Sequence, residues 1–238
     1  MRIIHERAPC PEELAYPAPD RDEIIVFDFS LAPGQMRVQA LLPHLDAGEQ
    51  ARANRFATPA LRERFIVAHG QTREILAALL GTHPRVPRFT FAREGKPCLP
   101  ELAALDLEFN LTHTSDRALL AVARGRQVGV DLERLRPMPE ALDLATQYFH
   151  PLEIQALSQQ DSATLATAFL SAWTRKESYV KAVGGGLSLP LSNFHAEIGS
   201  GKFRRWMVKD DSVEKNTWYV GDLVVGDDHV AAITFSDG

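Results

Sequence analysis

The order of the predicted secondary-structure elements occurs twice along this chain, and this order limits the possible folds. Each half begins with a strand, continues with helices and returns to strands. No residue-level repeat accompanies the order, so any duplication is one of topology. At 238 residues, the chain can form one large domain or two of about 120 residues each. We therefore predict a mixed α+β protein.

Local signals define the elements of the first half. Four prolines within the first 20 residues predict an irregular arm. Thr58-Pro59 is a typical helix start and Gly81 a typical helix end, and they bound an amphipathic segment. The first-half prediction is a strand at 24–29, helical spacing from 46 to 80 with a break before Thr58, and strands at 88–91 and 107–111.

The second half is predicted to begin near the turn at 124–126. This turn separates two β-like runs, 118–123 and 127–132, and the spacing predicts a β-hairpin. We place the domain boundary there, with an N-terminal half of residues 1–123 and a C-terminal half of residues 124–238. The other second-half elements are helices at 139–149, 151–159 and 164–183, the last followed by three glycines, and strands at 194–198, 203–208, 218–225 and 230–235.

Composition argues against several functional classes. The net charge of −5 lacks the basic character of nucleic-acid-binding domains. No apolar run approaches the length of about 18 residues that a membrane span needs, and the charged N-terminus lacks the pattern of a signal peptide. Cys10 and Cys98 form no metal-binding pattern. We therefore expect a cytoplasmic protein with free thiols and with no nucleic-acid or membrane partner.

The first candidate site is the sequence V-G-V-D-L-E at residues 128–133. Residues two apart in a strand share a face, so Asp131 and Glu133 are expected to project together. Neighbouring carboxylates in an apolar strand repel each other unless a cation lies between them, and hard oxygen ligands favour Mg²⁺ or Mn²⁺. The alternative is a strand end that runs into solvent, with Glu133 paired to a nearby arginine.

The predicted helix at 164–183 carries the second candidate. Glu177 and Lys181 are one turn apart, with the glutamate first, the order that favours an ion pair on a helix. In one interpretation they form an ordinary surface pair, worth about 0.3–0.5 kcal/mol. In the other, Glu177 is a third carboxylate for the metal, and Lys181 clamps a phosphate or accepts a proton.

Two polar segments form the third candidate, G-K-P at 95–97 and T-H-T-S at 112–115. A glycine beside a lysine lets the backbone approach a phosphate while the ammonium neutralises its charge. The GxxxxGK[ST] frame of a Walker A loop is missing. The four hydrogen-bonding side chains at 112–115 end a predicted strand, but no GxSxG motif accompanies them, so hydrolase chemistry at Ser115 is not expected.

The order of these motifs resembles that of the Sfp-type 4′-phosphopantetheinyl transferases. A further region at 52–74 is similar to the arginine-rich helix region of that family. The motifs are G-K-P (95–97), F-N-L-T-H-T-S-D (109–116), V-G-V-D-L-E (128–133) and the segment 169–191, which matches the family pattern W-x-x-K-E-x-x-x-K at Trp173, Lys176, Glu177 and Lys181.

The resemblance implies a Mg²⁺-dependent enzyme, with Mn²⁺ as the other candidate metal. Such an enzyme transfers the 4′-phosphopantetheine arm of coenzyme A to a serine of an apo acyl or peptidyl carrier protein and releases 3′,5′-ADP. It implies a monomer of two similar α+β halves related by a pseudo-twofold axis, with the site between them. The N-terminal half would contact the coenzyme A phosphates, and the C-terminal half would supply the metal carboxylates and the catalytic helix.

The resemblance also implies roles for individual residues. Asp131, Glu133 and Glu177 would bind the metal, and Glu177, or as second choice Lys181, would activate the serine hydroxyl. Lys96 and Lys181 would balance phosphate charge. Thr112 and His113 would contact the coenzyme A phosphates, and Arg52, with Arg64, would contact the 3′-phosphate.

The chain departs from the family pattern at Ser115, where glycine is usual. A serine makes a backbone with positive φ less favourable at that position. At Ser178 the family usually has alanine, and serine is small enough to be tolerated.

Five arginines near the proposed site are candidates for carrier binding. Carrier proteins are typically acidic and the whole chain is acidic too, so attraction of a carrier would need a local group of positive charges. They are Arg117, Arg124, Arg126, Arg134 and Arg136. We expect reversal of Arg124 and Arg126 to glutamate to weaken carrier binding more than coenzyme A binding. The alternative is that these arginines lie on a solvated hairpin without such a role.

Two other functions stay open at this point. A Mg²⁺-dependent phosphohydrolase could use the same carboxylates with water as the nucleophile. A degenerate module could bind coenzyme A or a carrier without catalysis, although retention of Asp131, Glu133, Glu177 and Lys181 together argues against it.

Overall fold

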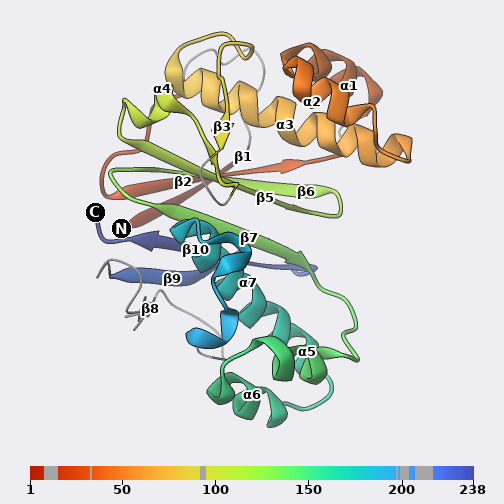
Figure 1. Ribbon diagram of the computed structural model, residues 1–238, viewed down its shortest axis with the longest axis vertical. Helices are drawn as coiled ribbons and strands as arrows, with labels where there is room; N and C mark the ends of the chain where they lie inside the picture. The colour runs from red at the N-terminus through yellow and green to blue at the C-terminus, as the bar shows by residue number, and fades with distance from the viewer. Residues whose placement is uncertain (8–15, 33, 92–94, 197, 199–203, 207–216) are drawn as a thin grey trace. The chain divides into compact units, whose positions relative to one another are not determined.

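The chain is divided into two units, and each combines a four-stranded sheet with helices (Figure 1). The computed structural model describes residues 1–7, 16–32, 34–91, 95–196, 198, 204–206 and 217–238. Unit 1 comprises residues 1–90 and 97–125, and unit 2 comprises residues 91–96 and 126–238. The division after residue 125 lies two residues beyond the boundary expected from the sequence, and the passage of 91–96 into unit 2 has no sequence signal.

Unit 1 has a sheet with the strand order β1-β2-β6-β5. β1 runs parallel to β2, whereas β6 pairs antiparallel with both β2 and β5. Its elements are β1 (Arg2–Arg7), β2 (Glu23–Ser30), α1 (Gln35–Leu41), η1 (Leu42–His44), α2 (Ala47–Ala53), α3 (Pro59–Leu80), β3 (Thr90–Phe91, which ends on the first residue of unit 2), β4 (Pro97–Cys98), α4 (Pro100–Ala103), β5 (Leu107–Thr114) and β6 (Arg117–Arg124).

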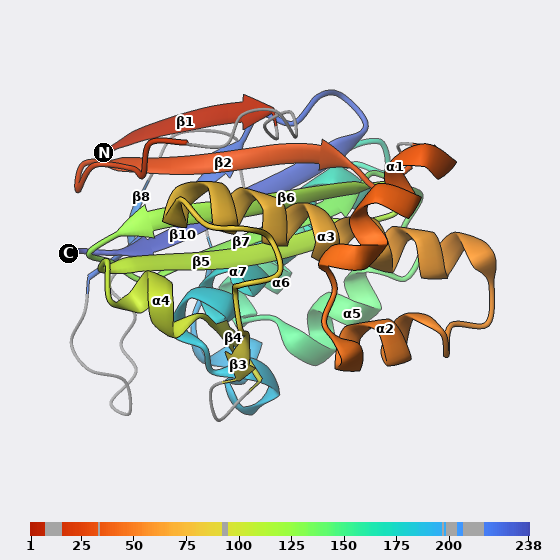
Figure 2. The same ribbon diagram turned by 90° about the horizontal axis from the view of Figure 1, so that it is seen from above.

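Helix α3 begins and ends where the sequence predicts. The Thr58 hydroxyl accepts a hydrogen bond from the Leu61 backbone N–H at 3.3 Å, and Pro59 occupies the first turn. Gly81 ends the helix in the left-handed region with φ 63°. The helix lies along the sheet of unit 1 (Figure 2), and its buried residues, including Ile66 and Ile75, join the core formed with β2, β5 and β6.

The prediction of an irregular arm over the first 20 residues is wrong for residues 2–7. These residues form β1, which pairs in register from Arg2 opposite Glu23 to Arg7 opposite Asp28. The paired residues of β1 and β2 are 21 positions apart in sequence, beyond the reach of local turn signals. Residues 8–15 lie outside the described part of the chain. Helix α1 was not predicted either.

Unit 2 has an antiparallel sheet with the strand order β7-β10-β9-β8. The three predicted helices of the second half are present, and the longest ends at Gly184 with φ 73°. The elements are β7 (Val128–Arg134), α5 (Ala141–Tyr148), α6 (Pro151–Ser158), α7 (Leu165–Val183), η2 (Gly186–Ser188), η3 (Leu191–Asn193), β8 (Arg204–Trp206), β9 (Trp218–Leu223) and β10 (His229–Ser236).

Helix α7 approaches the backbone of β7 closely at Gly129. A Cβ atom at this position would lie 2.1 Å from the Ser178 carbonyl oxygen and 2.3 Å from the Ala182 amide nitrogen. Only glycine allows this separation. The contact matters for the candidate site because Asp131 and Glu133 follow on β7 and Glu177 and Lys181 lie on α7.

The predicted hairpin between 118–123 and 127–132 is wrong. Both segments are strands, but β6 pairs with β2 and β5, whereas β7 pairs with β10. The connection 125–127 joins two different sheets: β6 pairs with the preceding strand β5 and with the distant strand β2, whereas β7 pairs with β10, which is far away in sequence. Two late strand predictions also need correction. Residues 194–196 have no regular structure, and of 203–208 the described residues 204–206 form β8, the rest lying outside the described part.

A three-stranded part of the sheet has the same topology in both units, in agreement with the repeated element order of the sequence, whereas the fourth strands differ: β1 lies beside β2, and β8 lies beside β9. In unit 1 strand β2 precedes the helices and pairs with β6, which also pairs with β5. In unit 2 strand β7 precedes the helices and pairs with β10, which also pairs with β9. The predicted mixed α+β class is therefore confirmed, while the pseudo-twofold axis stays a prediction. Among the described residues, no helix is both long and apolar enough to cross a bilayer.

Candidate functional site

The carboxylates of β7 lie on the face of the strand that α7 covers. Asp131 and Glu133 alternate with Val130 and Leu132, as a strand period of two requires, and they share a face with Gly129. Asp131 is 6% exposed, and Glu133 is half-buried. They pair with Ala232 and Val230 of β10, whose small or apolar side chains offer no charge to either carboxylate. Arg136 Nη1 lies 3.5 Å from Glu133 Oε2, so the pairing of Glu133 with a nearby arginine, expected as the alternative, is present. The neutralisation of Asp131 must come from elsewhere.

Helix α7 supplies one such charge. The Lys181 ammonium donates to Asp131 Oδ1 at 2.6 Å and to the Val130 carbonyl oxygen at 3.4 Å. Glu177 lies one turn before Lys181 on the same side of the helix. The surface pair of Glu177 and Lys181 considered from the sequence is therefore not the main contact, because the lysine reaches across to the strand. This pairing depends on how α7 packs on β7 and has no signal in the sequence.

The group carries an excess of negative charge. Burial, and then the charge of Asp131, raise the pKa of Glu133 above its usual value, although Arg136 and Lys181 oppose the shift. Burial and the charge of Asp131 likewise raise the pKa of Glu177, with Lys181 opposing. Each carboxylate is thus destabilised in its ionised form by its neighbours. A cation bound among them would relieve this repulsion.

The donor set fits a hard divalent cation in its chemistry. Three carboxylates offer oxygen ligands, which suit Mg²⁺ or Mn²⁺ better than softer metals. In the part of the chain that the structure describes, however, no three histidine, cysteine, aspartate or glutamate side chains are gathered closely enough to form a metal site. Asp131 is instead engaged by Lys181 at 2.6 Å. Charge and ligand chemistry, rather than formed coordination geometry, therefore favour a metal here.

Lys96 contacts the end of α7. Its ammonium donates to the Ala182 carbonyl oxygen at 3.2 Å, one of the last carbonyls of the helix. Residues 91–96 belong to unit 2, so this lysine lies in the same unit as the carboxylates. The helix C-terminus carries partial negative charge that a lysine complements.

Thr112 and His113 lie near the end of β5 in unit 1. They pair with Leu119 and Ala118 of β6, and as neighbours in a strand their side chains face opposite sides of the sheet. Thr112 is buried and His113 is exposed. The structure therefore does not bring these two predicted ligands onto one face.

Arg52 and Arg64 lie on α2 and α3 of unit 1. Arg52 is exposed at the last turn of α2, and its guanidinium carbon lies 5.2 Å from the centre of the Phe65 ring. Arg64 precedes that phenylalanine on α3 and is half-buried.

The lysine of the K-E pair, Lys176, has a structural environment that the sequence did not indicate. It is fully buried, its ammonium pairs with Glu153 at 2.8 Å, and it donates to the Phe194 carbonyl oxygen at 2.5 Å. Burial lowers its pKa to about 8, although Glu153 opposes the shift. Glu153 also accepts a hydrogen bond from the Ala196 N–H, so the pair connects α6 and α7 with the segment after η3.

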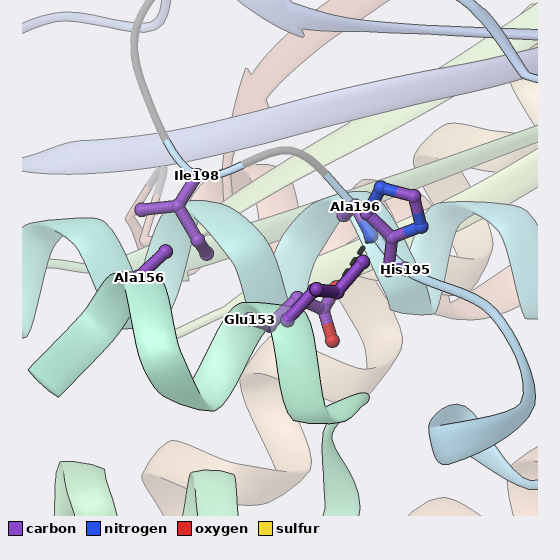
Figure 3. Close-up of a pocket in the computed structure, with 6 residues that line it drawn as sticks. Glu153, Ala156, His195, Ala196 and Ile198 are labelled. Atoms are coloured by element: carbon purple, nitrogen blue, oxygen red, sulfur yellow. Dashed lines mark hydrogen bonds between the residues drawn. The ribbon is translucent and has the colours of Figure 1, made fainter.

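A cavity of about 230 Å³ lies beside this pair (Figure 3). Its lining comes from α6 and the segment that Glu153 holds, and it includes none of the residues proposed from the sequence. The lining residues are Leu152, Glu153, Ala156, His195, Ala196 and Ile198.

The arginines considered for carrier binding are partly committed to the fold. Arg124 donates to the carbonyl oxygens of Pro19 and Leu105 at 2.9 and 2.8 Å. Arg126 donates to the Ser236 carbonyl oxygen at 3.2 Å. The hairpin that would carry both is not formed. Reversal of their charge would remove these bonds and is therefore no selective test of carrier binding.

Comparison with known proteins identifies the class. Residues 127–234, which include β7 and α7, match the model of the 4′-phosphopantetheinyl transferase superfamily. The chain is 38% identical to the 4′-phosphopantetheinyl transferase HetI of Nostoc sp. over 168 residues, 70% of this chain and 71% of the relative. It is 34% identical to the 4′-phosphopantetheinyl transferase Sfp of Bacillus subtilis over 111 residues, 47% of each chain.

This chain belongs to the 4′-phosphopantetheinyl transferase superfamily. The predicted family and the predicted enzyme class, a transferase, are therefore confirmed. The activity expected from the motifs, transfer of phosphopantetheine from coenzyme A to a carrier protein, is the activity of this family.

Proposed function

We propose that this chain transfers the 4′-phosphopantetheine arm of coenzyme A to a serine of an apo carrier protein in a Mg²⁺-dependent reaction. The observation that carries the assignment of the site is the group of Asp131, Glu133, Glu177 and Lys181, in which β7 and α7 combine one buried and two half-buried carboxylates with one half-buried lysine. We further propose that the enzyme is a cytoplasmic monomer.

The reaction forms one bond and breaks one. The serine oxygen of the carrier bonds to the phosphorus that carries the pantetheine arm, and the bond from this phosphorus to the bridging pyrophosphate oxygen breaks. 3′,5′-ADP leaves with the electron pair of that bond, and the serine proton passes to a base. Reactions of this kind depend mainly on positioning and on neutralising phosphate charge.

Asp131, Glu133 and Glu177 would hold the cation. When bound, it would neutralise the pyrophosphate and polarise the phosphorus under attack. The raised pKa values of Glu133 and Glu177 support this role, because burial and the charge of Asp131 disfavour their ionised forms, and a bound cation would oppose both effects.

Glu177 is the better candidate for the base. The Lys181 ammonium already donates to Asp131 Oδ1 at 2.6 Å and is therefore engaged by that carboxylate. We therefore assign Lys181 to charge balance at the phosphates and Glu177, directly or through water, to activation of the serine hydroxyl. A raised glutamate pKa makes it a stronger proton acceptor at neutral pH.

The coenzyme A phosphates would be contacted by basic side chains. In this proposal Arg52, with Arg64, contacts the 3′-phosphate, and Lys96 and His113 contact the pyrophosphate region; Thr112, which is buried and faces the other side of the sheet from His113, is assigned no contact. Exposure of Arg52 and His113 supports their access to a ligand.

The test is the intact mass of a purified apo carrier protein after incubation with this chain, coenzyme A and Mg²⁺. We expect the carrier to gain one phosphopantetheine arm, and the gain to disappear when a chelator replaces the metal. Glu177→Gln is expected to abolish most of the gain, while Arg55→Ala, an exposed change outside the proposed site, is expected to leave it intact.

Other outcomes would redirect the assignment. Consumption of coenzyme A without any gain in carrier mass would favour a phosphohydrolase. Binding of coenzyme A with no consumption would favour a binding module. A mass gain that persists in chelator would contradict the metal dependence and leave the transferase activity in place.

A further inference from the structure

Two pairs of side chains, one of which includes Arg52, connect helices α2 and α3. Glu49 and Arg52 lie one turn apart on α2, and Phe65 and His69 lie one turn apart on α3. His69 Nδ1 is 3.0 Å from Glu49 Oε1, and the Arg52 guanidinium carbon is 5.2 Å from the centre of the Phe65 ring. The two side chains of α2 thus meet the two side chains of α3 in antiparallel order, Glu49 with His69 and Arg52 with Phe65.

The Phe65 ring is fixed by its surroundings. Its side chain is 8% exposed, and its ring centre lies 4.0 Å from that of His69 and 5.2 Å from that of Phe56. A buried ring in contact with two other rings has little rotamer freedom left to lose when a cation lies over its face. Arg52 therefore rests on a rigid support.

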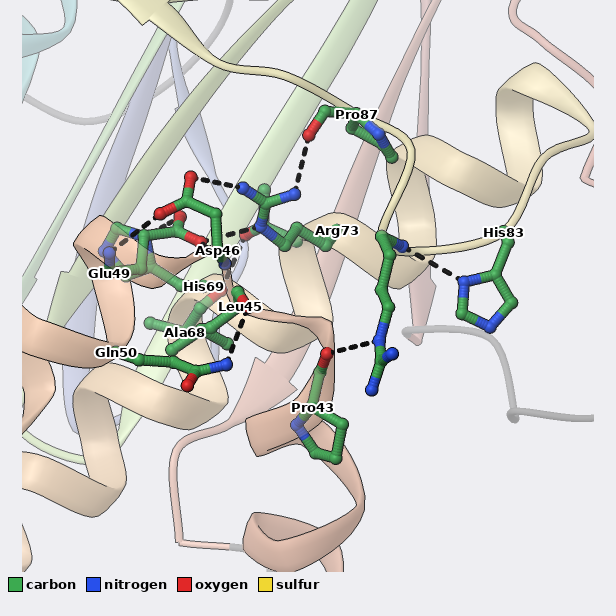
Figure 4. A network of polar contacts seen from close by, with 12 residues as sticks. Pro43, Leu45, Asp46, Glu49, Gln50, Ala68, His69, Arg73, His83 and Pro87 are labelled. Carbon is green, nitrogen blue, oxygen red and sulfur yellow. Dashed lines mark hydrogen bonds and ion pairs between the residues drawn. The ribbon is translucent and has the colours of Figure 1, made fainter.

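The position of α2 is fixed by a second set of contacts (Figure 4). Arg73 of α3 is 1% exposed and donates to Glu49 at 2.8 Å, to Asp46 at 3.0 Å and to the Pro87 carbonyl oxygen at 2.6 Å. Asp46 and Glu49 also form the capping box that starts α2. The helix that carries Arg52 is therefore anchored one turn before that residue.

Arg52 itself keeps its hydrogen-bonding capacity. Among the described residues, no carboxylate forms an ion pair with its guanidinium. An arginine stacked on a ring still presents its N–H groups at the edge of the guanidinium plane, the edge that matches a phosphate. The arrangement leaves a cation that is positioned but not neutralised.

We propose that Phe65 is a positioning residue that holds the Arg52 guanidinium ready for the 3′-phosphate of coenzyme A. This inference rests on the proposed function, in which Arg52 contacts that phosphate. Stacking reduces the number of Arg52 conformations before the ligand arrives, so less freedom is lost on binding. Phe65 acts through Arg52 and does not touch the reacting atoms.

The test compares coenzyme A with 3′-dephospho-coenzyme A in the transfer reaction. Pentafluorophenylalanine in place of Phe65 keeps the shape of the ring but removes the negative charge density of its face, and Phe65→Met keeps most of the volume without a ring. Both changes are expected to raise the KM for coenzyme A about two- to fivefold with little change in kcat. The KM for 3′-dephospho-coenzyme A should not change. The separate variant Phe65→Trp keeps an aromatic ring and should have the wild-type KM for coenzyme A.

Two further variants separate the inference from the function on which it rests. Arg52→Ala is expected to raise the KM for coenzyme A about ten- to a hundredfold and to leave that of the dephospho substrate unchanged. Tyr148→Leu, which removes an exposed aromatic ring on α5 of unit 2 and leaves the contact between Arg52 and Phe65 intact, serves as the control and should have neither effect.

Each other result has a defined meaning. If Arg52→Ala does not distinguish the two substrates, the assignment of Arg52 to the 3′-phosphate is wrong and the inference fails with it. If Arg52→Ala does distinguish them but both Phe65 replacements match the wild type, the role of Phe65 alone is overturned. An equal rise in KM for both substrates would show that Phe65 supports the fold and not the contact with the 3′-phosphate.

Discussion

Ser115 adopts a backbone conformation that residues with a side chain rarely take. Its φ is 51°, in the turn that joins β5 to β6, and the sequence indicated that a residue other than glycine would be unfavourable at this position. The left-handed region costs an L residue about 1–2 kcal/mol, a cost that glycine does not have. Part of this gain is lost because glycine gives the unfolded chain more conformational entropy than serine does.

Ser115→Gly is therefore expected to stabilise the protein by about 0.5–1 kcal/mol. The measurement is the free energy of unfolding by denaturant titration. Asp116→Gly in the same turn is the control, because Asp116 does not have a positive φ and its replacement should destabilise. Equal effects of the two changes would contradict the explanation.

His44 is a histidine whose neutral form is favoured by the fold. Burial, together with His83 and Arg37, lowers its pKa below the usual value, although Glu74, whose carboxylate is 3.2 Å from His44 Nε2, opposes the shift. Its Nδ1 is buried and has no hydrogen-bond partner in the described part of the chain. The folded protein thus binds a proton at His44 less readily than the unfolded chain does.

This difference predicts a pH dependence of stability. The contribution of neutral His44 is fully present above the unfolded pKa of about 6.5 and is lost as the pH falls below it. Between about pH 7.5 and 5.5, the wild type should lose more unfolding free energy than His44→Gln, whose side chain does not titrate. Parallel pH profiles for the two proteins would show that His44 has no such effect.

At the scale of elements, Gly129 controls the distance between β7 and α7. Gly129→Ala would place a Cβ 2.1 Å from the Ser178 carbonyl oxygen, and a backbone atom of a long helix cannot yield as a flexible side chain can. We expect a loss of about 3 kcal/mol or more, since overpacking against backbone exceeds the usual cost of an added methyl group.

Thermal unfolding measures this effect, and Gly48→Ala is the control. Gly48 lies in α2, where an added Cβ would meet the Asp46 side chain at 3.3 Å and alanine has the higher helix propensity. Any loss of stability should be confined to Gly129→Ala. A wild-type melting temperature for that variant would mean that α7 can move away from β7 without cost.

Lys176 and Glu153 connect α7 with α6 through a buried ion pair. Removal of one partner leaves an uncompensated charge, which costs about 3–5 kcal/mol, whereas removal of both costs less than the sum. Lys176→Met, Glu153→Gln and the double variant form a double-mutant cycle. We expect a coupling of about 2 kcal/mol in the free energy of unfolding. Additive single effects would show that the two charges do not depend on each other.

At the scale of the whole molecule, a metal that binds the folded protein alone should stabilise it. At a concentration of 100 times its dissociation constant, such a ligand adds about 2.7 kcal/mol. We expect Mg²⁺ to raise the unfolding temperature and a chelator to reverse the rise. Glu177→Gln should reduce this response and lower kcat by about 100- to 10,000-fold.

Without metal, the free energy of unfolding of Glu177→Gln should be at least as high as that of the wild type. The variant removes a carboxylate whose ionised form is disfavoured by burial and by Asp131. Asp161→Asn, an exposed acidic change between α6 and α7, provides the control and should keep the full response to Mg²⁺. An unfolding temperature that does not respond to the metal in the wild type would contradict the assignment of the three carboxylates.

Much of the candidate site follows from spacing along the chain. The strand period puts Asp131 and Glu133 on one face, and the helix period puts Glu177 and Lys181 one turn apart. The bond from Lys181 to Asp131 does not follow from either period, because 50 residues separate the two and only the packing of α7 on β7 joins them. The burial of Lys176 likewise depends on the packing of segments that are distant in sequence and does not follow from spacing along the chain.

The sequence by itself determined the features that depend on a few neighbouring residues. Thr58, Pro59 and Gly81 bound α3, Gly184 ends α7, and the apolar run of β2 is a strand, because caps and backbone angles are decided within one turn. The tertiary structure decided the partners: β6 and β7 are close in sequence but belong to different sheets, and β1 pairs with β2 instead of forming an irregular arm. Strand pairing and burial depend on residues that are distant along the chain, and local preferences carry no information about which of them meet.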